Sequence, residues 1–238
     1  MSDQPVFALP ADAVLWANKL DLSKTADPVR GRAGQAAAAF VARAAEMGLG
    51  VFWTNNLGWM QAVAEKSPLA HVWAPLRAHH WPDYRDTTAV LALAPNGGGA
   101  VLATICVRRL WIEDELGAAL ASQFGTNAYS ELLAFAGDLA RDVRDCHIAW
   151  ACGLWRADLL RGARIGGDLI AMAAIDALAR WRWSWFLGLR REQAQHRLGL
   201  GLFDRLEAPV VDIEARQMML VAARRARVRA HLFEGAGA

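Results

Sequence analysis

The spacing of apolar residues along the chain changes at Thr87. Before it, apolar residues recur at helical spacing in two alanine-rich stretches, residues 10–20 and 28–50, and a third such stretch follows near 60–65. The second stretch ends in Gly-Leu-Gly, a signal that commonly ends helices. We therefore expect residues 1–85 to form a helical N-terminal extension that packs on the rest of the chain.

After Thr87 the pattern is typical of strands. Residues 87–95 and 99–112 are apolar on both faces over much of their length, and Asn-Gly-Gly-Gly between them is a strong turn signal. These stretches predict an antiparallel hairpin. Since neither stretch alternates cleanly, helices must cover both faces of its sheet.

The second half of the chain alternates predicted helices and strands, after a helical insertion at 113–145. The expected elements are a strand at 146–155, a helix at 164–180, a strand at 183–189, a short helix at 192–200, a strand near 208–213 and a final C-terminal helix from 215. A strand, a helix and a second strand in this order predict parallel neighbours in one sheet. The expected fold class is therefore α/β, with residues 86–238 as its core.

Composition narrows the class of protein. With 238 residues, 55% apolar and 21% charged, the chain has the composition of a folded protein. No apolar run reaches the roughly 18 to 20 residues of a membrane span, and the N-terminus lacks the order of a secretory signal, so we expect a cytoplasmic location and no membrane partner. A net charge of +2 and a basic cluster at 224–229 that suits a solvated helix face predict no nucleic-acid partner.

The three cysteines, Cys106, Cys146 and Cys152, all fall in apolar stretches predicted to be strands. An odd number of buried cysteines favours free thiols over a disulfide. No His or Cys pairs stand at zinc spacing, so we expect no metal site.

Two arginines and three glycines follow the strand at 146–155, where residues 159–169 are Leu-Leu-Arg-Gly-Ala-Arg-Ile-Gly-Gly-Asp-Leu. In α/β sheets ligands bind at the carboxyl ends of strands, and the unpaired N–H groups of a helix N-terminus favour an anion there. Gly162 lets the backbone approach such a ligand, while Arg161 and Arg164 add positive charge. A pyrophosphate suits this junction, although the residues match neither a P-loop nor a dinucleotide motif.

The same junction is similar to the coenzyme A loop of the GNAT superfamily of N-acyltransferases, whose pattern is Arg or Gln, two residues, Gly, one residue, then Gly or Ala. The matching residues are Arg161-Gly162-Ala163-Arg164-Ile165-Gly166. Arginine replaces glycine at the fourth position. The resemblance covers residues 86–213 and includes the long insertion at 113–145.

The resemblance implies a GNAT-like mixed central sheet with helices on both faces. It implies acetyl-CoA or another acyl-CoA as cosubstrate, lying where two parallel strands separate. The pantetheine arm would pair with the backbone of Leu154, Trp155 and Arg156, and the pyrophosphate would lie on the amides from Gly162 to Gly166. The backbone amide of Arg156 would donate to the oxyanion.

Other catalytic groups follow less directly. The family's thiolate acid is often a tyrosine, and its position here falls near Leu198, which cannot donate a proton. His147, in the predicted strand that leads to the coenzyme, is a candidate base, and His196 is another. The segment before the hairpin holds candidate acceptor contacts at His79, His80 and Tyr84.

Three functions fit these features. The first is an acyl-CoA-dependent N-acyltransferase that moves an acetyl group to an amine of a small molecule or a protein. The second is a non-catalytic GNAT-like domain that binds coenzyme A or a protein. The third is an enzyme like the N-acyl amino acid or acyl-homoserine lactone synthases, suggested by Arg108 and Arg109 after an apolar strand. The acceptor amine is not identified, and the N-terminal extension could serve as the arm of a homodimer.

The substitution Arg161→Ala tests the phosphate assignment. Removing a guanidinium that pairs with a phosphate should weaken coenzyme binding by about tenfold or more, measured by calorimetric titration with acetyl-CoA. An unchanged affinity would contradict the assignment.

Overall fold

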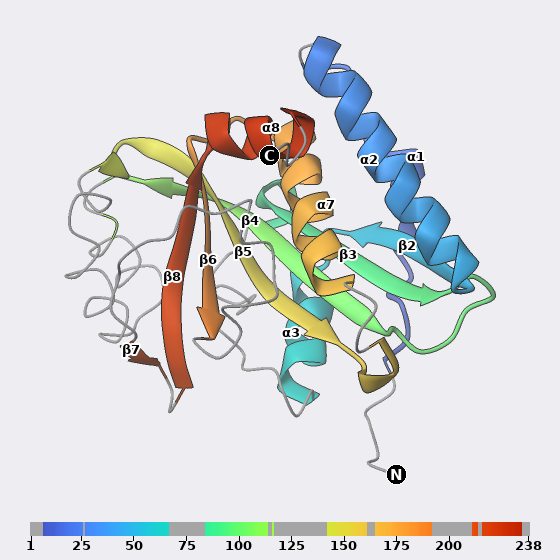
Figure 1. The fold of residues 1–238 in the computed structure, drawn as a ribbon. Helices are drawn as coiled ribbons and strands as arrows, with labels where there is room; N and C mark the ends of the chain where they lie inside the picture. Colours follow the sequence, from blue (N-terminus) through green and yellow to red (C-terminus); the bar gives the residue numbers. More distant parts are fainter. Residues whose placement is uncertain are drawn as a thin grey trace.

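Eight strands form one mixed sheet in the computed structural model (Figure 1). The structure describes residues 7–25, 27–66, 84–113, 116, 142–160, 165–191, 211–213 and 216–234. The strand order is β1-β2-β3-β4-β5-β6-β8-β7. Among the described strands β5 and β6 are parallel, and every other neighbouring pair is antiparallel.

The N-terminal part of the chain supplies strands to this sheet as well as helices. Its elements are β1 (Val14–Leu15), α1 (Trp16–Lys19), α2 (Asp27–Glu46), β2 (Leu49–Thr54) and α3 (Leu57–Lys66). The helix α2 ends as predicted, because Gly48 adopts φ 73° and donates its N–H to the carbonyl of Ala45 at 2.9 Å. The strand β2 then pairs with β3 along its full length.

The description of residues 1–85 as a helical extension needs correction. β2 lies inside the sheet with one edge on β3 and the other on β1, so the N-terminal residues and the predicted core share one sheet. Helix was expected at 10–20, where only the four residues of α1 are helical. Residues 49–54 form a strand because the six residues of β2 are almost all buried, and a short apolar run covered on both faces suits a strand.

The remaining elements confirm the hairpin and the parallel pair. They are η3 (Tyr84–Thr87), β3 (Thr88–Pro95), β4 (Ala103–Ile112), β5 (Cys146–Arg156), η4 (Asp158–Leu160), α7 (Ile165–Arg180), β6 (Trp185–Arg191), β7 (Val211–Ile213), β8 (Arg216–Arg224) and α8 (Arg225–Glu234). Most of the insertion expected at 113–145, and the helix expected at 192–200, lie outside the described residues.

The C-terminal helix expected from residue 215 begins ten residues later, at Arg225. Residues 216–224 form β8 instead, which pairs with β6 from Trp185↔Arg224 to Arg191↔Met218. Their Met, Leu and Ala residues are good helix formers, but the free edge of β6 supplied a strand partner along most of their length. The tertiary structure overrode the local propensity here.

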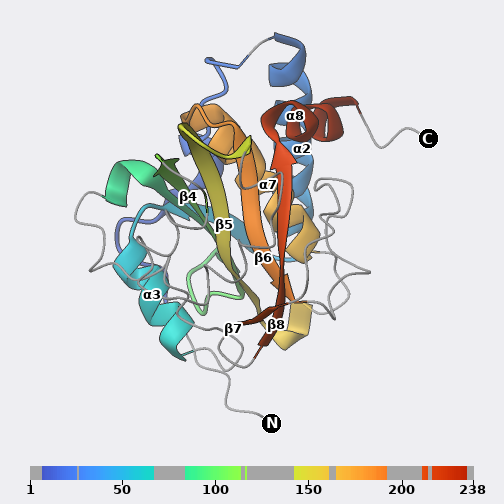
Figure 2. The ribbon, with the colours of Figure 1, turned by 90° about the vertical axis from the view of Figure 1, so that its left-hand side faces the viewer.

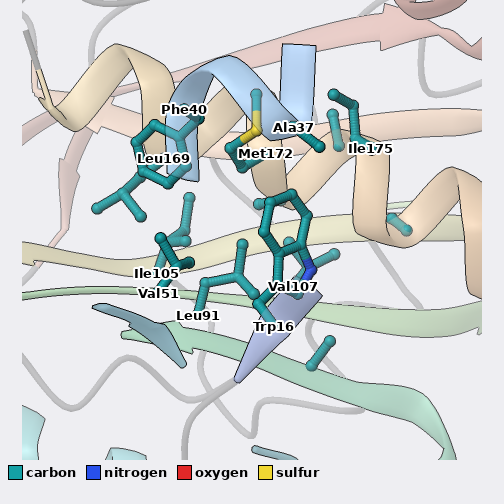
Figure 3. Close-up of a cluster of buried hydrophobic side chains, with 14 of the residues drawn as sticks. Trp16, Ala37, Phe40, Val51, Leu91, Ile105, Val107, Leu169, Met172 and Ile175 are labelled. Carbon is teal, nitrogen blue, oxygen red and sulfur yellow. The ribbon is translucent and has the colours of Figure 1, made fainter. Parts of the chain in front are cut away.

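Helices cover both faces of the sheet, as Figure 2 shows with α3 on one side and α2 and α7 on the other. Along β3 and β4, alternate residues reach the two sides. Leu91 and Ile105 join the large cluster with Phe40 of α2 and Leu169 of α7 (Figure 3). On the opposite face, α3 packs on Val90 and Cys106. The result is the GNAT-like mixed α/β sheet that the sequence predicts.

A buried carboxylate ties the N-terminal residues to α7. Asp176 is 1% exposed and accepts a hydrogen bond from Trp16 Nε1 at 2.8 Å and from Arg180 Nε at 2.6 Å. The Arg180 guanidinium also lies 4.3 Å from the ring centroid of Trp53 on β2. One acid therefore joins α1, α7 and the edge of the sheet. No helix among the described residues is long and apolar enough to cross a membrane.

The substitution Asp176→Asn should lower the free energy of unfolding by about 3 kcal/mol, because it leaves a largely buried guanidinium without its counter-charge. Urea unfolding followed by circular dichroism measures the change.

The matched control is Asp168→Asn on the same helix. Asp168 pairs with Arg43 at 3.0 Å, but both side chains are substantially exposed, so its loss should cost about 1 kcal/mol or less. Equal effects of the two substitutions would contradict the role given to Asp176.

Candidate functional site

The pairing between β5 and β6 ends before either strand does. The parallel register runs from Ile148↔Trp185 to Ala151↔Gly188 and stops there. Beyond it, β5 stays paired with β4 as far as Arg156, and β6 stays paired with β8 as far as Arg191. Among the described residues, 152–156 of β5 therefore have β4 on one side and no strand paired on the other; we call them the unpaired edge.

A β-bulge lies at the start of the unpaired edge. Cys152 pairs with Cys106 and Trp155 pairs with Thr104, so two residues of β5 oppose the single residue Ile105 of β4. The first of them, Gly153, has φ 62°, in the left-handed region that favours glycine. An extra residue bends and twists the strand that carries it. This bend accounts for the loss of pairing with β6.

The backbone direction along the unpaired edge follows from one hydrogen bond. The N–H of Ala157 donates to the carbonyl of Leu102 at 2.7 Å, toward β4. Because successive backbone groups of a strand point to alternate sides, the N–H and C=O of Arg156 point away from β4. The Arg156 amide is thus directed to the side where a ligand backbone could pair.

The side chains at this edge differ in exposure. Leu154 is 39% exposed, which is unusual for leucine in a strand flanked by other strands, whereas Trp155 is buried and contacts Phe7 edge to face with ring centroids 5.9 Å apart. Arg156 is half-buried. An exposed leucine beside unpaired backbone offers an apolar contact to a bound ligand.

The helix α7 follows the edge closely in sequence. Its first residues, Ile165 and Gly166, are buried, so this end is held firmly against the sheet. The other predicted phosphate-binding residues, Arg161, Gly162, Ala163 and Arg164, lie outside the described residues. Asp168 adds a carboxylate to the first turn, and its pairing with Arg43 offsets that charge.

His147 lies at the other end of β5. It is the second residue of the strand and nine residues before Arg156, a separation of about 30 Å at the rise of an extended strand. Burial and the nearby Arg109 guanidinium lower the pKa of His147, and its ring lies 4.8 Å from the ring of Trp111. The structure does not bring His147 together with Arg156, so it cannot serve there as a base.

Tyr84 lies closer to the unpaired edge. It packs, as Cys152 does, on the cluster of α3, Val90 and Cys106. Burial, followed by the Cys106 thiol, raises the pKa of Cys152 well above its usual range, so this thiol stays protonated at neutral pH. The other expected acceptor contacts, His79 and His80, and the candidate base His196 lie outside the described residues.

Arg108 is a charged residue inside the sheet, and the sequence indicated it only faintly. Its side chain is fully buried, opposite Thr88 on β3 and Trp150 on β5, and burial lowers its pKa. The signal was its place in an otherwise apolar strand, two residues after Cys106.

All three cysteines are free thiols, and no group of His, Cys, Asp and Glu suited to a metal occurs in the part of the chain that the structure describes.

No protein-family model matches the chain, and no curated protein matches it. Several solved structures resemble it, among them two synthases of N-acyl compounds and one N-acetyltransferase. FeeM, an N-acyl amino acid synthase from uncultured soil microbes, aligns with a TM-score of 0.40 and 13% identity over 60% of this chain and 71% of its own. BjaI, a CoA-dependent acyl-homoserine lactone synthase solved with SAM and isopentyl-CoA, aligns with a TM-score of 0.37 and 14% identity over 67% of this chain and 76% of its own.

The third is a provisionally named N-acetyltransferase from Lactobacillus plantarum, with a TM-score of 0.40 and 13% identity over 74% of this chain and 98% of its own. Because these scores and identities are low, the assignment of a GNAT-like fold rests on the strand order of this chain and its parallel β5–β6 pair.

Proposed function

We propose that this chain is an acyl-CoA-dependent N-acyltransferase. The observation that carries the proposal is the unpaired edge of β5, which begins at the Gly153 bulge and directs the Arg156 amide away from β4. An extended ligand with its own amides, such as the pantetheine arm of coenzyme A, would complete the hydrogen bonds that β6 leaves unmade.

The thioester would then lie beside Arg156. A neutral amine attacks the thioester carbonyl carbon, a carbon–nitrogen bond forms, and the carbonyl oxygen gains negative charge. The carbon–sulfur bond then breaks, and the released thiolate of coenzyme A takes up the proton that the nitrogen loses. A backbone N–H held by a strand is a preorganised donor for that oxygen. The pyrophosphate would be held by the amides after Arg161 at the start of α7, as the sequence motif predicts.

Acyl transfer would be direct. Cys152 is the cysteine at the unpaired edge, but burial keeps its thiol protonated, so it is a poor nucleophile for an acyl-cysteine intermediate. The amine therefore receives the acyl group from coenzyme A itself. Leu154 would contact the apolar part of the arm or of the acyl chain.

Binding and turnover test the proposal together. Calorimetric titration should show acetyl-CoA and 3′-dephospho-CoA binding with affinity on the order of micromolar, and excess ATP should not displace either coenzyme. Amines should then raise the release of free coenzyme A thiol above background. Binding without any release would indicate the non-catalytic domain, and no binding of either coenzyme would overturn the proposal.

Two substitutions at one position separate backbone from side chain. Arg156→Pro removes the N–H that faces away from β4, so turnover should fall by about 100-fold or more. Arg156→Ala keeps the N–H and should stay within about threefold of the wild-type turnover, because the oxyanion donor needs no particular side chain.

Thermal unfolding of both variants checks that the sheet is intact. The Arg156 N–H takes no part in the pairing with β4, so proline does not remove a bond of that ladder. Equal losses of turnover in folded Arg156→Pro and Arg156→Ala would exclude the backbone donor.

A further inference from the structure

A basic groove lies at the end of the sheet opposite the unpaired edge. It is formed where β5 and β6 begin and where β8 passes into α8, and it consists of two hollows of about 470 and 460 Å³ that share Trp183, Ser184 and Arg225. Four arginines and two aspartates line the groove: Arg182, Arg224, Arg225, Arg229, Asp142 and Asp145.

The charges in this groove do not balance. Asp142 pairs with Arg224, which leaves Asp145 as the other lining carboxylate against three further guanidinium groups. Within the described residues, no carboxylate pairs with Arg182 or Arg229, and both side chains are exposed. Arg182 and Arg229 also lie close enough to Arg225 to lower its pKa, after the larger effect of burial. Counted over the described lining residues, the groove therefore holds repelling cations and an excess of about two positive charges.

Arg225 is held in place by the protein, whereas the side chains of Arg182 and Arg229 are exposed and available to a ligand. Its Nη1 donates to the carbonyls of Trp181 and Trp183 at 3.3 and 3.4 Å, and its N–H donates to Ser184 O at 2.8 Å. The guanidinium also lies 5.3 Å from the Trp183 ring centroid. These contacts fix a cation at the floor of the groove at the cost of partial burial.

The helix α8 adds to the positive potential. It begins at Arg225, its first turn has no acid, and the neighbouring Ala226 lines the groove. The N-terminus of a helix favours negative charge, so basic residues in its first turn oppose the helix dipole. An anion bound at this end would offset both the dipole and the repulsion between the arginines.

We propose that this groove binds a phosphorylated small molecule, at a site separate from the acyl-CoA site. A phosphate monoester carries a charge of about −1.5 to −2 at neutral pH, which matches the excess charge, and its oxygens suit guanidinium forks. Trp111, 46% exposed at the groove wall beside His147, offers a flat apolar surface for the organic part. The inference does not depend on the acyltransferase activity.

The double substitution Arg182→Gln/Arg229→Gln tests the site, with AMP and inorganic phosphate as probes and Arg32→Gln, an exposed arginine on α2, as the matched control. AMP should bind the wild-type protein and the control with the same affinity. Its affinity for the double variant should be lower by about tenfold or more. Inorganic phosphate should show the same order of affinity for the three proteins, and should bind each of them more weakly than AMP does. Each titration is made at constant ionic strength, because surface electrostatics are screened by salt.

Three results would overturn the proposal. If AMP and phosphate do not bind, or if they bind all three proteins equally, the groove is not their site. Loss of AMP binding in the presence of saturating acetyl-CoA would place AMP in the acyl-CoA site instead. A single-stranded oligonucleotide that binds more than about tenfold tighter than AMP would identify the groove as a nucleic-acid surface. An unchanged thermal unfolding temperature of the double variant shows that its weaker affinity comes from the lost arginines of the groove and not from unfolding.

Discussion

The mismatch between β4 and β5 at Gly153 is the constraint on which the candidate site depends. Two residues of β5 must fit opposite one residue of β4, and glycine adopts the left-handed conformation that this requires. The extra residue turns β5 away from β6 at the point where their parallel pairing stops. Every feature proposed for acyl transfer, from the direction of the Arg156 amide to the exposed Leu154, lies after this point.

The scaffold around the bulge is held from both faces and from the N-terminal part of the chain. The large cluster between α2, α7 and the sheet fixes the helix that begins just after the unpaired edge. Asp176 adds a directed link, since it joins Trp16 and Arg180 in a buried network. A site that needs a backbone amide in a set direction gains from such a rigid frame, because preorganised donors require no rearrangement during the reaction.

The two ends of β5 have different chemistry. The carboxyl end has the unpaired edge, the exposed Leu154 and the partly buried Cys152, whose pKa is raised by burial. At the amino end, His147 shares a hollow with Arg182, Arg225 and Arg229, and its pKa is lowered by burial and by Arg109. Phosphate binding is therefore proposed at both ends: backbone amides together with Arg161 would hold it at the carboxyl end, and guanidinium groups alone at the amino end.

The sequence by itself determined the hairpin of β3 and β4, the parallel pair β5 and β6, and the helix α7, because apolar spacing and turn residues act locally. Through the resemblance to the GNAT superfamily it also predicted a backbone donor at Arg156. Only the tertiary structure decided that residues 49–54 and 216–224 are strands, since sheet edges supplied the partners that their local sequence could not specify. It likewise separated His147 from Arg156 and gathered the arginines of the groove, because the distance between residues along a strand and the meeting of distant segments are properties of the fold.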